Sequence, residues 1–205
     1  MSKAVLISIR QEWVEKILNG EKTLEVRKTR PKLETPFKAY IYCTAGNLSY
    51  RVNNGMMCNI SGGKLVVGEF ECDSIKTYNL NYYKHPDIGM DYNCGDVWWE
   101  ISDEDLGRAC LTEKEFGLYA FGREEMYGWH ISKLEIYDTP KELNEFWFPP
   151  ELYCEKERCG GCPYDQVADV NGEYSFDCEW KRPLTRPPQS WCYVEEQRWP
   201  YVNLL

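Results

Sequence analysis

The stretch that decides the fold reads Gly20-Glu21-Lys22-Thr23-Leu24-Glu25-Val26-Arg27-Lys28, and it follows a short amphipathic segment. Successive side chains of a β-strand point to opposite faces. If residues 23–28 form a strand, Leu24 and Val26 face a core, and Thr23, Glu25 and Arg27 form a polar row on the other face. This row either lines a binding cleft or meets water as the solvated face of an ordinary half-exposed strand.

The length of 205 residues allows one well-formed core with a small appendage. No apolar run approaches the roughly 20 residues that span a bilayer. The first ten residues become polar too soon for a signal peptide, so we expect a cytoplasmic protein. Without an export signal, the ten cysteines indicate free thiols or metal ligands rather than a disulfide framework.

Charge is distributed unevenly along this acidic chain. The formal net charge is −9, and proteins of this sign do not generally coat nucleic acid without sequence preference. Residues 1–40, however, hold nine Lys and Arg against five Glu, a local charge of +4. A basic region on an acidic body favours a short or pocketed anionic ligand over the wrapping of a long duplex.

The hydrophobic pattern predicts short strands with helices between them. Strands are expected at residues 4–9, 23–28, 37–43, 66–72 and 127–137, and helices at residues 11–19, after Ser102, after Thr112 and at residues 140–147. Residues 44–63 are rich in Gly, Asn and Ser and are expected to form a loop or an excursion of the chain. Gly68, inside the strand at 66–72, indicates a bulge or a sharp bend.

This order of elements predicts an α+β fold, a small mixed β-barrel with flanking helices. A doubly wound α/β domain is disfavoured because the sequence has neither regular strand–helix alternation nor a glycine-rich phosphate loop. After Pro149 the composition changes to Cys, Pro and Gly. We therefore predict a barrel at residues 1–148 and a Cys-rich extension at residues 149–205 that packs on it.

The motif Gly20-x-Lys22-Thr23-x-x-x-Arg27 and its surroundings resemble the ASCH domain of the PUA-like superfamily. The resemblance extends over most of residues 3–147 and is carried by residues 7–9, 13–28, 66–70, 127–131 and 137–143. The Cys-rich end is similar to tails of ASCH proteins from phages and prophages. The resemblance implies a PUA-like β-barrel with a cleft beside the first helix that binds RNA or a modified nucleotide.

Some ASCH proteins are hydrolases that remove an acyl group from a modified cytidine, with a Lys, a Thr nucleophile and a Glu. Lys22 matches the lysine of this family, but Glu25 occupies the position of the nucleophile. The resemblance therefore favours binding over catalysis, and Lys22, Thr23 and Glu25 would be the catalytic residues if the protein is an amidohydrolase. A phage protein that engages a host protein is a further alternative.

The expected ligand-binding residues are Lys22, Glu25, Arg27, Lys28 and Trp129. Arg27 can hold a phosphate or carboxylate through two parallel hydrogen bonds, and a lysine can bind a phosphate as a point charge. An exposed Trp129 could stack on a base. The alternatives are a structural Lys22–Glu25–Arg27 network that fixes the strand, and a Trp129 that belongs to the barrel core.

The cysteines of the extension have spacings that suit a structural zinc site. Cys154, Cys159 and Cys162, with Cys178 or Cys192 as the fourth ligand, could supply four thiolates, and the two glycines between Cys159 and Cys162 permit a tight turn. Zinc would order a tail that has little apolar sequence of its own. Reduced packing cysteines and disulfides are the alternatives.

Overall fold

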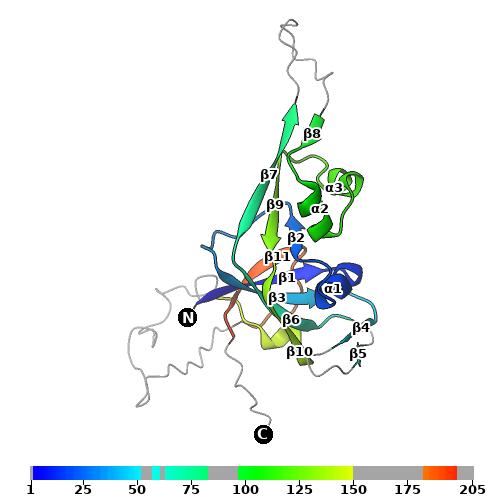
Figure 1. The fold of residues 1–205 in the computed structure, drawn as a ribbon. Helices are drawn as coiled ribbons and strands as arrows, with labels where there is room; N and C mark the ends of the chain where they lie inside the picture. The colour runs from blue at the N-terminus through cyan, green and yellow to red at the C-terminus, as the bar shows by residue number, and fades with distance from the viewer. Residues whose placement is uncertain (1, 52–56, 61–62, 83–96, 150–181, 198–205) are drawn as a thin grey trace, which may run out of the picture.

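The computed structural model describes residues 2–51, 57–60, 63–82, 97–149 and 182–197. The larger sheet has the strand order β10-β6-β3-β1-β11 (Figure 1). Its strands are β1 (Lys3–Ile9), β3 (Phe37–Cys43), β6 (Val66–Cys72), β10 (Ser132–Lys141) and β11 (Trp191–Glu195). The β1–β3 pair is parallel and the other pairs are antiparallel, so the sheet is mixed.

The second sheet is antiparallel and has the order β2-β9-β7-β8. Its strands are β2 (Leu24–Arg27), β7 (Ile75–Tyr82), β8 (Val97–Trp99) and β9 (Glu125–His130). Helices α2 (Asp103–Ala109) and α3 (Glu113–Tyr119) lie against this sheet (Figure 1). Ser102 caps α2 and Thr112 forms the capping box of α3, which confirms the starts predicted for both helices.

Two short connections join the sheets and curl them into a half-open barrel. β6 continues into β7 through residues 73–74, and β9 continues into β10 through Ile131. The single strand predicted at residues 127–137 is therefore wrong, because the chain leaves one sheet for the other at Ile131. At this corner the backbone N–H of Ile131 donates to Thr23 O and that of His130 donates to Ser74 O, both at 3.0 Å.

Helix α1 (Gln11–Leu18) follows β1 directly and buries Val14, Ile17 and Leu18. Gly20 has φ +75°, a left-handed conformation in which glycine carries no side-chain penalty, and it ends the helical segment as predicted. The buried face of α1 joins a core cluster that includes Ile7, Ile41, Phe70 and Trp129. α1 thus fixes the position from which the chain enters β2.

Leu24 and Val26 belong to a second core cluster, formed with Tyr78, Phe116 and Met126 between the smaller sheet and helices α2 and α3. The predicted alternation along β2 is therefore confirmed for its apolar face. Gly68 lies where β6 passes very close to β10, because a Cβ at this position would be 2.4 Å from Glu135 O. The β6–β10 register shifts on both sides of the Gly68–Ile136 pair, as expected for an irregular strand.

A second predicted element is also wrong. The helix expected at residues 140–147 is the end of β10 followed by a single 3-10 turn, η1 (Leu143–Glu145). β10 lies at the edge of its sheet, where Pro140 can be accommodated although it has no N–H to donate. Residues 44–63, expected to form a loop or an excursion, contain the paired strands β4 (Leu48–Arg51) and β5 (Met57–Ile60), which form a two-stranded sheet of their own.

The fold class is α+β with a mixed, curled sheet, as predicted. Of the predicted extension, residues 182–197 are described, and they contribute β11 to the same sheet as β1. The domain boundary at 148/149 stays a prediction. Within the described ranges, no helix combines the length and the apolar character needed to cross a membrane.

Candidate functional site

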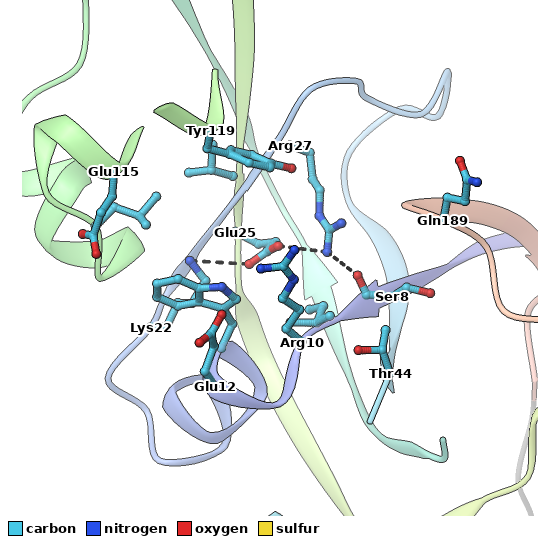
Figure 2. Close-up of a pocket in the computed structure, with 14 residues that line it drawn as sticks. Ser8, Arg10, Glu12, Lys22, Glu25, Arg27, Thr44, Glu115, Tyr119 and Gln189 are labelled. Atoms are coloured by element: carbon cyan, nitrogen blue, oxygen red, sulfur yellow. Dashed lines mark hydrogen bonds and ion pairs between the residues drawn. The ribbon is translucent and has the colours of Figure 1, made fainter. Parts of the chain in front are cut away.

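Lys22, Glu25 and Arg27 lie together at a pocket of about 450 Å³ beside α1 (Figure 2). The pocket is bounded by the end of β1, the start of α1, strand β2, the α2–α3 segment and Gln189. Its lining consists of Ser8, Ile9, Arg10, Glu12, Trp13, Lys22, Glu25, Val26, Arg27, Thr44, Leu111, Glu115, Tyr119 and Gln189. This volume is in the range of pockets that hold a small organic ligand.

The three charged residues form one buried network. Glu25 Oε1 lies 2.9 Å from Arg27 Nη2, and Glu25 Oε2 lies 3.4 Å from Lys22 Nζ (Figure 2). Exposed fractions are 3% for Lys22, 6% for Glu25 and 7% for Arg27. Charges this deeply buried must be paired, since an isolated buried charge costs several kcal/mol. Both oxygens of the carboxylate are therefore committed to the two cations.

Lys22 is fixed by the elements on either side of it. Its backbone N–H donates to Lys16 O of α1, and its Nζ donates to Ala109 O at 2.6 Å. Ala109 is the last residue of α2, and the carbonyl end of a helix favours a cation. Nζ also lies 5.2 Å from the centre of the Trp13 ring, a cation–π contact. These contacts fix the position of Nζ at the pocket.

Arg27 connects β2 to β1 and to the extension. Its Nη2 donates to Ser8 O at 2.8 Å, and its Nη1 lies 3.5 Å from Ser190 Oγ. Arg27 Nε is buried and has no hydrogen-bond partner. The guanidinium therefore has donor capacity that the described protein groups do not use, which is unusual for a buried polar group.

Charges in the pocket lining balance. Three cations, Arg10, Lys22 and Arg27, face three carboxylates, those of Glu12, Glu25 and Glu115. Hydrogen bonds from the Thr112 backbone N–H and hydroxyl lower the pKa of Glu115 and keep it ionised. The basic character of residues 1–40 is thus neutralised within the pocket, so a neutral polar ligand suits the lining better than a highly charged anion.

Two aromatic side chains, Trp13 and Tyr119, also line the pocket. Tyr119 is at the end of α3, and Figure 2 shows its ring above Glu25 and beside Arg27. Burial raises the pKa of the Tyr119 phenol, so its hydroxyl stays protonated near neutral pH and can donate a hydrogen bond. Flat aromatic rings beside hydrogen-bonding groups are the kind of surface that binds a heterocyclic base.

Three of the residues singled out from the sequence lie elsewhere. Thr23 precedes β2, accepts a hydrogen bond from Arg108 Nε at 3.3 Å and does not line the pocket. Trp129 is fully buried and packs edge-on against Phe37, so the expectation that it stacks on a ligand is corrected to a core role. Lys28 is half-buried outside the lining, with Nζ 5.2 Å from the centre of the Tyr119 ring.

Several lining residues were not expected from the sequence. Arg10 and Glu12 flank the start of α1 and could have been suspected from their closeness to the charged stretch. Tyr119, Glu115 and Gln189 are distant in the sequence and come to the pocket only through the packing of α3 and of the extension. No local pattern marks them as partners of Lys22 or Arg27.

Most of the cysteines predicted to bind zinc, Cys154, Cys159, Cys162 and Cys178, lie outside the described residues. Cys192, the alternative fourth ligand, is part of β11, and burial raises the pKa of its thiol to about 12. Within the part of the chain that the structure describes, no cluster of His, Cys, Asp or Glu could hold a metal ion. The zinc site stays a prediction.

Solved structures similar to this one are ASCH proteins. The crystal structure of ASCH from Zymomonas mobilis aligns with a TM-score of 0.45 and 17% identity, over 69% of this chain and 75% of that chain. A single-residue variant of that protein aligns with a TM-score of 0.44 and 18% identity, over 70% and 78% of the two chains. No family model matches the sequence, and a search of curated proteins gives no match.

These solved structures carry the name of the family that the sequence resembles. An origin in phages or prophages stays a prediction. The function proposed below is argued from the residues of the pocket.

Proposed function

We propose that the pocket binds a nucleoside-like ligand, a single base of an RNA strand or a modified nucleotide. The observation that carries this proposal is the buried Lys22–Glu25–Arg27 network in a pocket that two aromatic rings also line. A base presents flat faces to aromatic rings and an edge of donors and acceptors to polar groups. The pocket supplies both kinds of surface at a volume of about 450 Å³.

The balanced charge of the lining supports a base in the pocket rather than a phosphate. A phosphate placed beside Glu12, Glu25 and Glu115 would meet three carboxylates along with three cations. Lys28 lies against the Tyr119 ring outside the lining and is placed to attract a phosphate attached to a stacked nucleoside. The base would then occupy the pocket, and the sugar–phosphate part would lie at its rim.

The contacts of the site support binding over hydrolysis. Glu25 stands where the related hydrolases have their nucleophile, and both of its oxygens pair with cations. Thr23, the nearest hydroxyl in the sequence, lies outside the pocket lining and accepts from Arg108. Lys22 Nζ is already engaged, because it donates to Ala109 O and is paired with Glu25. Amidohydrolase activity on an acylated nucleoside is the second candidate and has no observation of its own.

Equilibrium binding of ribonucleoside monophosphates and of short single-stranded RNA tests the proposal. We expect saturable binding by the wild-type protein and its loss in the double variant Lys22→Ala/Arg27→Ala. The matched control is Lys38→Ala/Lys76→Ala, which removes two lysines paired with buried carboxylates away from this pocket. Circular dichroism confirms that each variant is folded.

Equal binding by the two double variants, or no binding by the wild-type protein, would contradict the proposal. Incubation of the same proteins with an acylated cytidine tests the second candidate. Release of the free acid by the wild-type protein, abolished in Lys22→Ala, would establish hydrolysis instead.

A further inference from the structure

One wall of the pocket comes from the segment that precedes β11. Ser8 at the end of β1 fixes this segment on both sides of Gln189, because Ser8 Oγ donates to Pro188 O at 2.7 Å and Ser8 N donates to Ser190 O at 2.8 Å. Ser8 is itself 6% exposed and lines the pocket. Gln189 therefore stands at the pocket on a backbone that is held by two hydrogen bonds to one buried residue.

The same segment is also attached to the chain that leaves β2. Trp191 Nε1 donates to Thr29 Oγ1 at 3.0 Å, and Lys32 N donates to Tyr193 Oη at 2.7 Å. Trp191 packs in addition against the buried Trp129, with ring centres 6.0 Å apart. These contacts, together with the approach of Ser190 to Arg27, fix the segment relative to β2 as well as to β1.

Gln189 is the one side-chain amide in the lining. Its side chain is exposed, and none of the hydrogen bonds among the described residues uses its amide group. An amide offers one acceptor and two donor hydrogens, so it can form a paired hydrogen bond with a base edge. Figure 2 shows Gln189 across the pocket from Glu115, at the edge that the extension forms.

The Lys22–Glu25–Arg27 network is less suited to distinguish one base from another. Both oxygens of Glu25 are paired with cations, and Lys22 donates to Ala109 O and contacts Glu25 and the Trp13 ring. Their positions are set by each other, so they shape the pocket for any occupant of the right size. The groups that can distinguish one ligand from another are then the polar groups of the lining that form no hydrogen bond within the protein.

We propose that Gln189 contacts the ligand through its amide and determines which base the pocket accepts. The inference rests on the proposed nucleoside-binding function and deepens it. It makes the segment before β11 part of the binding site rather than a support for the sheet. The ligand class is a base that presents a donor and an acceptor side by side on the edge that faces this wall.

The test compares two substitutions at Gln189 with the same substitutions at a control position. Gln189→Ala removes the amide, and Gln189→Glu replaces the donor with a second acceptor. Gln197→Ala and Gln197→Glu are the matched controls, because Gln197 is in the same extension and outside the pocket lining. Affinities are measured by calorimetry for the monophosphates of adenosine, guanosine, cytidine and uridine.

We expect Gln189→Ala to weaken the binding of the preferred nucleotide by about five- to tenfold, the usual net effect of a lost hydrogen bond. Gln189→Glu should change the order of preference among the nucleotides, since a carboxylate cannot donate. The Gln197 variants should keep the affinities and the order of the wild-type protein. Both Gln189 variants should keep the wild-type melting temperature, since Gln189 is exposed.

Nucleotide binding by the wild-type protein with unchanged affinities and order in both Gln189 variants would overturn this inference and leave the proposed function standing. Equal changes in the Gln189 and Gln197 variants would also overturn it, since they would indicate a general effect on the extension. Absence of binding by the wild-type protein would overturn both proposals.

Discussion

Two buried glutamates, Glu25 on β2 and Glu69 on β6, make closely similar contacts in different surroundings. Glu25 is paired with Lys22 and Arg27 and lines the pocket. Glu69 is paired with Lys38 at 2.5 Å and accepts a hydrogen bond from the Tyr137 hydroxyl at 2.5 Å. The two residues are 6% and 7% exposed. Depth of burial and pairing with a lysine therefore do not distinguish them.

The two glutamates differ in what lies around the carboxylate and its partners. Glu69 is covered by Lys38 from β3 and Tyr137 from β10, the strands on either side of β6 in the same sheet. The partners of Glu25 come from its own strand and from the turn after α1, and the space opposite is occupied by the pocket. The comparison teaches that the two carboxylates differ in their position relative to the pocket and not in their depth of burial, so burial and pairing alone do not mark a candidate site.

The largest expected effect is that of Glu25→Ala. Removal of one member of a buried charged network leaves the other members unpaired and costs about 3–5 kcal/mol of unfolding free energy. Here Lys22 and Arg27 would remain buried without their shared carboxylate, and ligand binding should be lost as well. Urea unfolding and calorimetric binding measure the two effects, and Glu25→Gln, which keeps an acceptor, should lose less stability. Wild-type stability of Glu25→Ala would show that Lys22 and Arg27 do not depend on the Glu25 carboxylate.

The next largest effect is expected for the cluster of Glu69, Lys38 and Tyr137. Tyr137→Phe removes the hydroxyl that donates to Glu69 and should destabilise the protein by about 1–3 kcal/mol, the cost of leaving a buried acceptor unsatisfied. Nucleotide affinity should stay at the wild-type value because Tyr137 is outside the pocket lining. A loss of affinity beyond the loss of folded protein would show that the two clusters are not separate.

A smaller loss of stability is expected when α3, which forms one side of the pocket, is weakened. Thr112→Ala removes the capping box of α3 and should cost about 1 kcal/mol of stability. Since α3 carries Glu115 and Tyr119 to the pocket, binding should weaken slightly while the Lys22–Glu25–Arg27 network is preserved. The capping serine of α2 provides the comparison: Ser102→Ala should cost a similar amount of stability and leave binding unchanged.

The smallest effect concerns a third buried carboxylate, Asp105, whose oxygens lie 2.9 and 3.0 Å from Lys76 Nζ. Burial of Asp105 raises its pKa, but the hydrogen bonds and charge of Lys76 outweigh this effect and hold the pKa below the ordinary value. A lowered pKa in the folded state stabilises the protein above the unfolded-state pKa, about 4, and this contribution is lost as the pH falls through the folded-state pKa.

Unfolding free energies of the wild-type protein and of Asp105→Asn, measured from pH 7 to pH 3, check this prediction. The difference between the two proteins should be constant above about pH 5 and should shrink below about pH 4. A difference that grows with acidity would mean that the carboxylate has a raised pKa in the folded protein.

Local patterns predicted the part of the fold that depends on local physics. The alternation of Leu24, Glu25, Val26 and Arg27 predicted that Leu24 and Val26 belong to the core, because strand geometry fixes which side chains share a face. The pocket side follows the prediction less closely, since Val26 also lines the pocket and Thr23, from the predicted polar row, does not. Gly20, with its positive φ, marked the end of the helical segment for a similarly local reason.

Other features were set by tertiary contacts. The alternating pattern of residues 127–137 continues through Ile131, and only hydrogen bonds to Ser74 and Thr23, distant in the sequence, show that the chain changes sheets there. Pro140 suggested a helix start, but an edge strand tolerates proline equally well. Tyr119 and Gln189 reach the pocket through packing that no short stretch of sequence encodes.

The pairing of β11 with β1 has a consequence for synthesis of the protein. Strand β1 can pair with β11 only after residue 195 has been synthesised. Until then, the free edge of β1 could pair with other unfolded chains. A pairing across so many residues also forms slowly. On the ribosome, the wall that carries Gln189 can form only after residue 195 has been synthesised, so a product interrupted before β11 would have the Lys22–Glu25–Arg27 stretch without the complete pocket.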